Sequence, residues 1–176
     1  MRKVKPVESL IYPVSTELVW DWLSDVPDPE IPVVSVVDLG IVRDVKWENR
    51  DLQVYITPTY SGCPATAVIA LDIETLLLGK GLNSVKVISI LSPAWTTAWI
   101  SETGREKLKA YGIAPPLDEP SCSGLLNLQG AKSVTVGCPR CESTNTERVS
   151  QFGSTPCKAS YRCKDCLEPF DYFKSF

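Results

Sequence analysis

The chain has 176 residues, of which 44% are hydrophobic and 22% charged, with a formal net charge of −3 and no histidine. This length fits one ordinary domain, or one small domain with a satellite. Without histidine the chain cannot form a Ser-His-Asp triad, a Cys-His pair or a two-His-one-carboxylate iron site, so a stand-alone enzyme is disfavoured. The small negative charge gives no electrostatic reason to expect nucleic-acid binding.

The composition also predicts a cytoplasmic protein without a membrane segment. The N-terminus lacks the apolar stretch and cleavage site of a secretory signal. No apolar run approaches the roughly 20 residues needed to cross a bilayer. The seven cysteines are odd in number and four have metal-ligand spacing, which favours a reducing compartment over a disulfide framework.

The first predicted elements are a helix and a hairpin. Residues 15–26 are expected to be helical, with Ser15 as the cap and an apolar surface that includes Leu18 and Leu23. The prolines of residues 27–32 end this helix. Two strand-like segments, 41–47 and 52–57, flank a polar turn and predict a β-hairpin.

Residues 64–80 form the longest predicted helix, which ends at its glycines. Its expected buried face follows Val68, Leu71, Thr75 and Leu78.

A strand at 85–91 and a charged helix at 101–111 complete the predicted order α-β-β-α-β-α. This order is typical of an α+β fold in which helices cover one three-stranded sheet. We therefore predict an α+β domain over residues 1–113, a proline-rich linker over 114–132 and a metal-binding ribbon over 133–176. The apolar segment 125–128 interrupts the linker and is a candidate for docking on either part.

The cysteines with metal-ligand spacing lie in the ribbon. Two Cys-x-x-Cys pairs, Cys138 with Cys141 and Cys163 with Cys166, are separated by 21 residues, and such pairs direct four thiolates at one metal ion. Sulfur ligation selects zinc, iron or an iron–sulfur cluster. Structural Zn²⁺ is preferred, because closed four-coordinate sulfur sites are commonly structural. An iron or [2Fe–2S] centre that transfers electrons is the alternative.

Two further cysteines are candidate cofactor-binding residues. Cys63 precedes Pro64 at the start of a predicted helix, so we expect it at the N-cap, where the helix dipole would favour a reactive thiolate. A cap without chemistry is the competing interpretation. Cys157 lies inside the ribbon and is either a small buried hydrophobe or a reactive thiol beside the metal. Cys122, in the predicted linker, is taken as incidental.

Three acidic residues precede the hairpin. Asp28, Glu30 and Asp38 are candidates for cation binding or for capping loop backbone, and capping is the commoner outcome.

Several motifs together resemble a known family. The segments 28–32, 37–42 and 57–65 resemble the SufT-like domain family, which is associated with iron–sulfur cluster assembly. With the segments 92–97, 101–105, 152–155 and 163–174, the whole chain resembles the PaaD (PaaJ) family, encoded with the multicomponent phenylacetyl-CoA epoxidase. One departure is Ala98, where the family pattern has an aspartate, so this chain lacks that carboxylate.

The resemblance implies an accessory role in aerobic phenylacetate degradation. It implies an oxygenase partner with a di-iron subunit and an iron–sulfur flavin reductase, and it marks Cys63 as the reactive cysteine. We therefore predict a maturation factor that assists assembly of an iron or iron–sulfur centre, contacts oxygenase subunits and is not itself the catalyst. Its oligomeric state, including a homodimer, is left open.

The rival interpretations are three. The first is an electron-transfer subunit of the same oxygenase, with iron or a [2Fe–2S] cluster in the ribbon and Cys157 as a candidate ligand. A nucleic-acid-binding ribbon ranks lowest, because basic and acidic residues nearly balance in residues 133–176. A thiol enzyme acting through Cys63 lacks an evident base.

Overall fold

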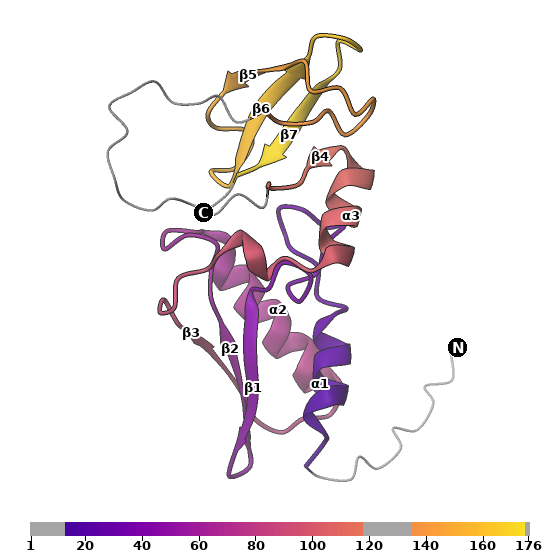
Figure 1. Ribbon diagram of the computed structural model, residues 1–176. Coiled ribbons are helices and arrows are strands. Elements are labelled where there is room, and N and C mark those ends of the chain that lie inside the picture. Colours follow the sequence, from indigo (N-terminus) through magenta and orange to yellow (C-terminus); the bar gives the residue numbers. More distant parts are fainter. Residues whose placement is uncertain (1–12, 118–134, 175–176) are drawn as a thin grey trace, which may run out of the picture.

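The structure is a computed structural model that describes residues 13–117 and 135–174 (Figure 1). The predicted linker beyond residue 117, including Cys122 and residues 125–128, lies outside the described residues. The elements are, in chain order, α1 (Thr16–Leu23), β1 (Val42–Glu48), β2 (Asp51–Ile56), α2 (Ala65–Gly79), β3 (Val85–Ser89), a 3-10 helix η1 (Thr97–Trp99), α3 (Glu102–Tyr111), β4 (Ile113–Ala114), β5 (Thr146–Ser150), β6 (Lys158–Cys163) and β7 (Pro169–Phe173).

The predicted α+β fold with a three-stranded sheet is confirmed. The strands are arranged β1-β2-β3, with β1 antiparallel to β2 and β2 parallel to β3. Asn49 makes the hairpin turn with a φ of 58°, a left-handed conformation that asparagine tolerates better than most residues. A parallel pair needs a long crossover, and α2 supplies it between β2 and β3.

The expected buried face of α2 is wrong. The residues of α2 that are buried are Ala65, Ile69, Ile73 and Leu77. Val68, Leu71 and Leu78 are 45%, 62% and 48% exposed. Apolar residues occur on several sides of this helix, so the helical period alone does not distinguish the core face from its neighbour.

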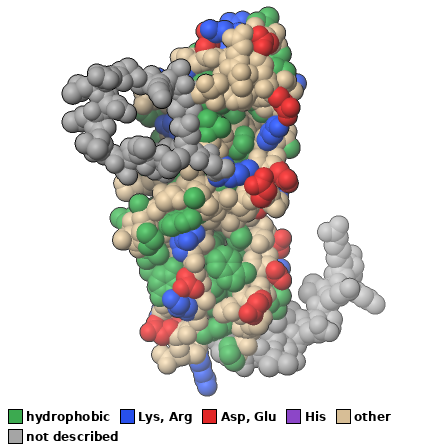
Figure 2. All heavy atoms as spheres, in the orientation of Figure 1, with side chains coloured by type: hydrophobic (Ala, Val, Ile, Leu, Met, Phe, Trp, Pro, Cys, Tyr) green, Lys and Arg blue, Asp and Glu red, His purple; other side chains and the backbone are tan. Residues whose placement is uncertain are grey.

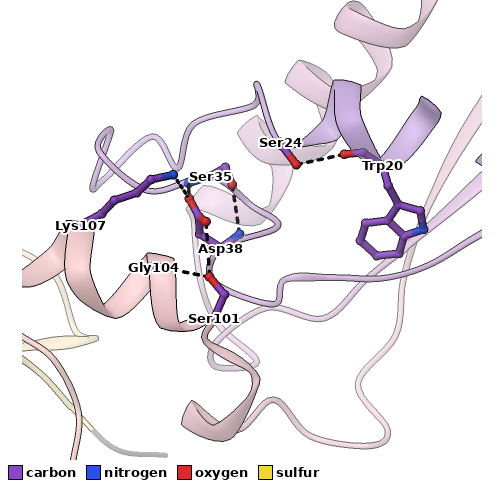
Figure 3. Close-up of polar contacts among 7 residues, drawn as sticks. All are labelled: Trp20, Ser24, Ser35, Asp38, Ser101, Gly104 and Lys107. Carbon is purple, nitrogen blue, oxygen red and sulfur yellow. Dashed lines mark hydrogen bonds and ion pairs between the residues drawn. The ribbon is translucent and has the colours of Figure 1, made fainter. Parts of the chain in front are cut away.

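The loop between α1 and β1 is held by an aspartate. The Asp38 carboxylate accepts hydrogen bonds from the Ser35 backbone N–H at 2.9 Å and from Lys107 Nζ at 2.6 Å, and Figure 3 shows both groups pointing at it. The carbonyl oxygen of Asp38 accepts from Ser101 N–H at 2.8 Å, at the start of α3. A Cβ on Gly104 would come within 2.9 Å of that carbonyl oxygen, so only glycine permits this close approach.

The ribbon (residues 135–174) supplies three strands of a second, four-stranded sheet. The order of this sheet is β4-β7-β6-β5, and β4, which lies before the ribbon in the chain, pairs in parallel with β7. The strand that directly follows α3 therefore joins the ribbon at the predicted domain boundary. The ribbon's own core holds residues such as Val136, Tyr161 and Phe170.

The ribbon and the α+β domain share a core. Cys157 and Phe173 of the ribbon are 4% and 1% exposed and belong to the main core. The Phe173 ring lies 6.1 Å from the Trp95 ring. In Figure 1 the ribbon, orange to yellow, sits directly on the α+β domain, with α3 and β4 leading into it. The ribbon is therefore packed onto the domain that precedes it.

The described helices cannot span a bilayer, and the face in view carries no single-sign field. Within the described residues, every helix is too short or too polar to span a membrane. Figure 2 shows basic and acidic side chains interspersed over one face.

The core face of α2 can be tested with two adjacent leucines. Leu77→Ala should lower the free energy of unfolding by about 3 kcal/mol, because it leaves a cavity at a fully buried site. Leu78→Ala should change it by about 0.5 kcal/mol or less, because that side chain is half exposed. Urea unfolding midpoints measure both, and equal losses would contradict the assigned face.

The Asp38–Lys107 pair predicts a pH-dependent stability. Burial opposes ionisation of Asp38, but the hydrogen bonds from Lys107 and Ser35 outweigh it and lower the pKa below its usual 3.8. The ionised carboxylate therefore stabilises the fold above the unfolded pKa, and this contribution is lost as the pH falls through the lowered folded pKa.

Lys107→Met should accordingly cost about 1 kcal/mol at pH 7, a value discounted because solvent reaches the lysine. The cost should shrink as the pH falls below the usual pKa of 3.8. Lys109→Met is the matched control on the same helix, because its ion pair with Glu142 has the same 2.6 Å length but is exposed. Thermal unfolding at several pH values measures both, and a cost independent of pH would contradict the assignment.

Candidate metal centre and thiol pocket

The four paired cysteines converge on one point. Cys138 and Cys141 precede β5, Cys163 ends β6, and Cys166 lies in the turn before β7. The Sγ atoms of Cys138 and Cys166 are 3.7 Å apart, and those of Cys141 and Cys163 are 3.6 Å apart. A tetrahedral ion with Zn–S bonds near 2.3 Å would place its sulfurs about 3.8 Å apart. The donor set therefore fits a tetrahedral ion bound only by sulfur.

The two Cys-x-x-Cys turns have the same backbone geometry. The N–H of Cys138 donates to the carbonyl of Ser143, and the N–H of Cys163 donates to that of Glu168, five residues on in each case. The residue after each second cysteine has a positive φ, 61° at Glu142 and 64° at Leu167. Neither residue is glycine, so the sequence gives no sign that the backbone is left-handed at these two positions.

Backbone groups favour a thiolate in this centre. The N–H of Cys166 points at Cys163 Sγ, at 3.5 Å. This N–H, followed by that of Asp165 and the neighbouring thiols, lowers the pKa of Cys163 to about 7. Thiolate is the form that binds a metal. The lowering does not extend to Cys141 or Cys166, because burial and the neighbouring thiols raise the pKa of Cys141 to about 12 and also raise that of Cys166.

The four ligand atoms all lie within 4.8 Å of one another. Among residues 13–117 and 135–174, this is the one group of three or more cysteine or acidic side chains placed to hold a metal ion. Cys157 is outside this group. The structure therefore does not place it as a competing ligand of the four-cysteine centre.

Cys63 and Cys157 instead line a cavity between the ribbon and the α+β domain. This thiol pocket has a volume of about 20 Å³ and is bounded by Cys63, Cys157, Asp28, Glu30 and Phe173, among others. The expected N-cap position of Cys63 is corrected by one residue: Pro64 is the N-cap of α2, and Cys63 lies in the turn before it. Cys63 is half-buried and packs against the main core.

The two acidic residues of the thiol pocket differ in what they bind. One oxygen of Asp28 accepts from the backbone N–H groups of Glu30 at 2.9 Å and Ile31 at 2.8 Å. Burial raises the pKa of Asp28, although these hydrogen bonds act in the opposite direction. Asp28 is thus used to cap the loop, as Asp38 is, whereas Glu30 points to the ribbon.

Glu30 accepts a hydrogen bond from the thiol of Cys157, with Oε2 and Sγ 3.7 Å apart. The Thr155 hydroxyl also lies 3.0 Å from this sulfur. Burial raises the pKa of Cys157 to about 11, with a further rise from the Glu30 charge. Cys157 is therefore a neutral thiol until something displaces its proton. Burial and the adjacent Cys63 likewise raise the pKa of Tyr60 to about 12.

Sequence reasoning did not predict that Phe173 lines the pocket or that Thr155 contacts the Cys157 sulfur. It also did not link Glu30 to Cys157. The acidic residues before the hairpin and the extra ribbon cysteine were visible as separate features. No sequence pattern pairs two side chains that are 127 residues apart.

The fold and the two sulfur sites define a protein in which an α+β domain is followed by a four-cysteine metal ribbon. Two family models match it: "Iron-sulfur cluster assembly protein" over residues 16–89 and "PaaD zinc beta ribbon domain" over residues 126–174. A protein of Escherichia coli (strain K12), named as a component of the "Putative 1,2-phenylacetyl-CoA epoxidase", is 46% identical over 164 residues, covering 93% of this chain and 95% of the relative.

The chain belongs to the PaaD family of phenylacetyl-CoA epoxidase components, as the resemblance predicted. Among solved structures, a DUF59 domain from Bacillus anthracis is 29% identical, covers 52% of this chain and 89% of its own, and has a TM-score of 0.48. A conserved hypothetical protein from Thermotoga maritima is 33% identical, covers 54% and 94%, and has a TM-score of 0.46.

Removing one ligand tests the metal centre. Cys163→Ser should lose one equivalent of bound metal and disorder the ribbon, because a module of this size buries too little apolar surface to fold unaided. Metal analysis, with near-UV circular dichroism of the ribbon tyrosines, measures both effects. Cys122→Ser is the control and should keep full metal. Retained metal and an unchanged spectrum in Cys163→Ser would contradict the assignment.

Proposed function

We propose that this protein is an assembly factor for the phenylacetyl-CoA epoxidase and not its catalyst. In this proposal Cys63 binds iron or an iron–sulfur centre transiently, the ribbon is held by structural zinc, and the ribbon contacts one of the oxygenase subunits. The protein acts in the cytoplasm as one component of a multisubunit system.

The observation that carries the proposal is the separation of two sulfur sites. The four-cysteine centre is closed, since four ligands complete a tetrahedral ion and leave no position for exchange. The thiol pocket offers fewer ligands and contains Cys63. A carrier needs such an incomplete site, because a cargo that is fully coordinated is released slowly.

The family matches support this division. The assembly-protein match over residues 16–89 includes Cys63, Asp28 and Glu30. The name of the Escherichia coli relative supports the epoxidase as the client. Interspersed charge on the surface in view gives no support to a nucleic-acid partner (Figure 2).

A second candidate is electron transfer through the ribbon. Cys141 and Cys166 are exposed, so an ion bound there would lie near the surface, as electron exchange requires. An iron centre would show visible absorption that bleaches on reduction. A colourless protein with one tightly held zinc would exclude it.

Replacing the proposed carrier thiol tests the main function. In cells that produce Cys63→Ala in place of the natural protein, the oxygenase subunits should be present at normal levels but should contain less iron and show less activity. The loss should approach that of a strain lacking the gene. Iron per oxygenase and epoxidase activity, both measured on the isolated complex, check this.

Cys122→Ala is the matched control and should give fully loaded oxygenase. An oxygenase with full iron content and full activity from the deletion strain would contradict the proposed function.

A further inference from the structure

We propose that the cargo site is composite, with Cys157 of the ribbon and Glu30 joining Cys63 to bind a single ferrous ion. The inference rests on the proposed function, in which Cys63 binds the cargo. It adds two ligands, assigns one of them to the ribbon, and restricts the cargo to one ion.

Cys157 is placed for this role by the packing of the ribbon. It is 4% exposed and lies in the main core, apart from the four-cysteine centre. Its carbonyl oxygen accepts from the Lys174 N–H at 2.9 Å, which ties the start of β6 to the end of β7. The Thr155 hydroxyl, 3.0 Å from Sγ, orients the thiol. The ribbon thus presents this sulfur to the pocket from a fixed backbone.

Glu30 is the carboxylate available to a metal. Its Oε2 already lies 3.7 Å from Cys157 Sγ, whereas Asp28 is engaged by two backbone N–H groups. The pocket therefore offers two thiols and the Glu30 carboxylate, beside Asp28, which uses one oxygen to cap the loop. Carboxylate suits harder divalent ions and thiolate suits softer ones, so the mixed set matches an ion of intermediate character such as Fe²⁺.

The size of the cavity limits the cargo. About 20 Å³ accommodates roughly one water-sized ligand, which is enough for one ion and too small for a two-iron cluster. Among the described residues, the four-cysteine group is the one already gathered to hold an ion. In this proposal the side chains of the three pocket donors turn toward one another when the ion binds.

The binding step balances without any redox change. Each thiol forms an S–Fe bond and releases one proton, while the ion loses coordinated water and remains ferrous. Glu30 accepts the hydrogen bond of Cys157, so it is the first acceptor of the Cys157 proton. It passes this proton to solvent before its own oxygen binds the ion.

Anaerobic titration of the full-length, zinc-loaded protein with a ferrous salt tests the composite site. The wild type should bind one Fe²⁺ beyond the metal of the ribbon, with near-UV thiolate-to-iron absorption. Cys157→Ala should weaken binding at least about tenfold, since even an outer-shell partner costs 10–100-fold. It should also remove about half of the thiolate absorption.

Two further variants keep the result interpretable. Glu30→Gln preserves the shape of the pocket and the buried sulfur. It should weaken Fe²⁺ binding to a similar degree, but the protein saturated with Fe²⁺ should keep its thiolate-to-iron absorption. Cys122→Ala should match the wild type. Zinc content and thermal unfolding of each variant show whether it is folded.

The outcomes separate this inference from the proposed function. If Cys63→Ala abolishes iron binding while Cys157→Ala and Glu30→Gln bind as the wild type does, the composite site is overturned and the carrier role of Cys63 stands. If Cys63→Ala binds iron with wild-type affinity, or the wild type binds no additional ion, the carrier role itself is overturned.

Discussion

The convergence of four thiols on one ion is the constraint on which the rest of the structure depends. Cys163 ends β6 and Cys166 lies in the turn into β7, so the metal fixes one end of this hairpin. The other end carries Cys157 and Phe173 into the main core. The four-cysteine centre and the thiol pocket therefore lie at opposite ends of the same two strands, roughly 20 Å apart for strands of this length.

The shared core follows from the small size of each part. A module of about 40 residues cannot bury enough apolar surface alone, and the metal compensates for only part of the conformational entropy lost on folding. Packing Phe173 against Trp95 and Cys157 over the pocket buries further apolar surface at the junction. The cavity at this junction is lined mostly by apolar side chains, with the thiols of Cys63 and Cys157 and the carboxyl groups of Asp28 and Glu30 among them.

Local signals in the sequence predicted much of the fold but little of the pocket. Caps, prolines and glycines are local, so the element order was predictable, and Ser15 does cap α1 as expected. The four-cysteine spacing is likewise local. The buried face of α2 was missed because several of its faces are apolar. The meeting of Glu30 with Cys157 depends on how two sheets pack, and no local pattern encodes that.

The two sulfur sites differ in the one property that separates a structural metal from a transferable one, which is the number of ligands. Four thiolates saturate a tetrahedral ion and leave only slow exchange. In the thiol pocket the raised pKa of Cys157 means that this thiol must give up a proton before it binds a metal. Burial and the neighbouring thiols also raise the pKa of Cys141, to about 12, and that of Cys166, so the smaller number of ligands is what weakens the thiol pocket relative to the ribbon centre. In the proposed function, an ion held in the thiol pocket is therefore easier to pass to a client that offers more ligands, whereas the ribbon keeps its own.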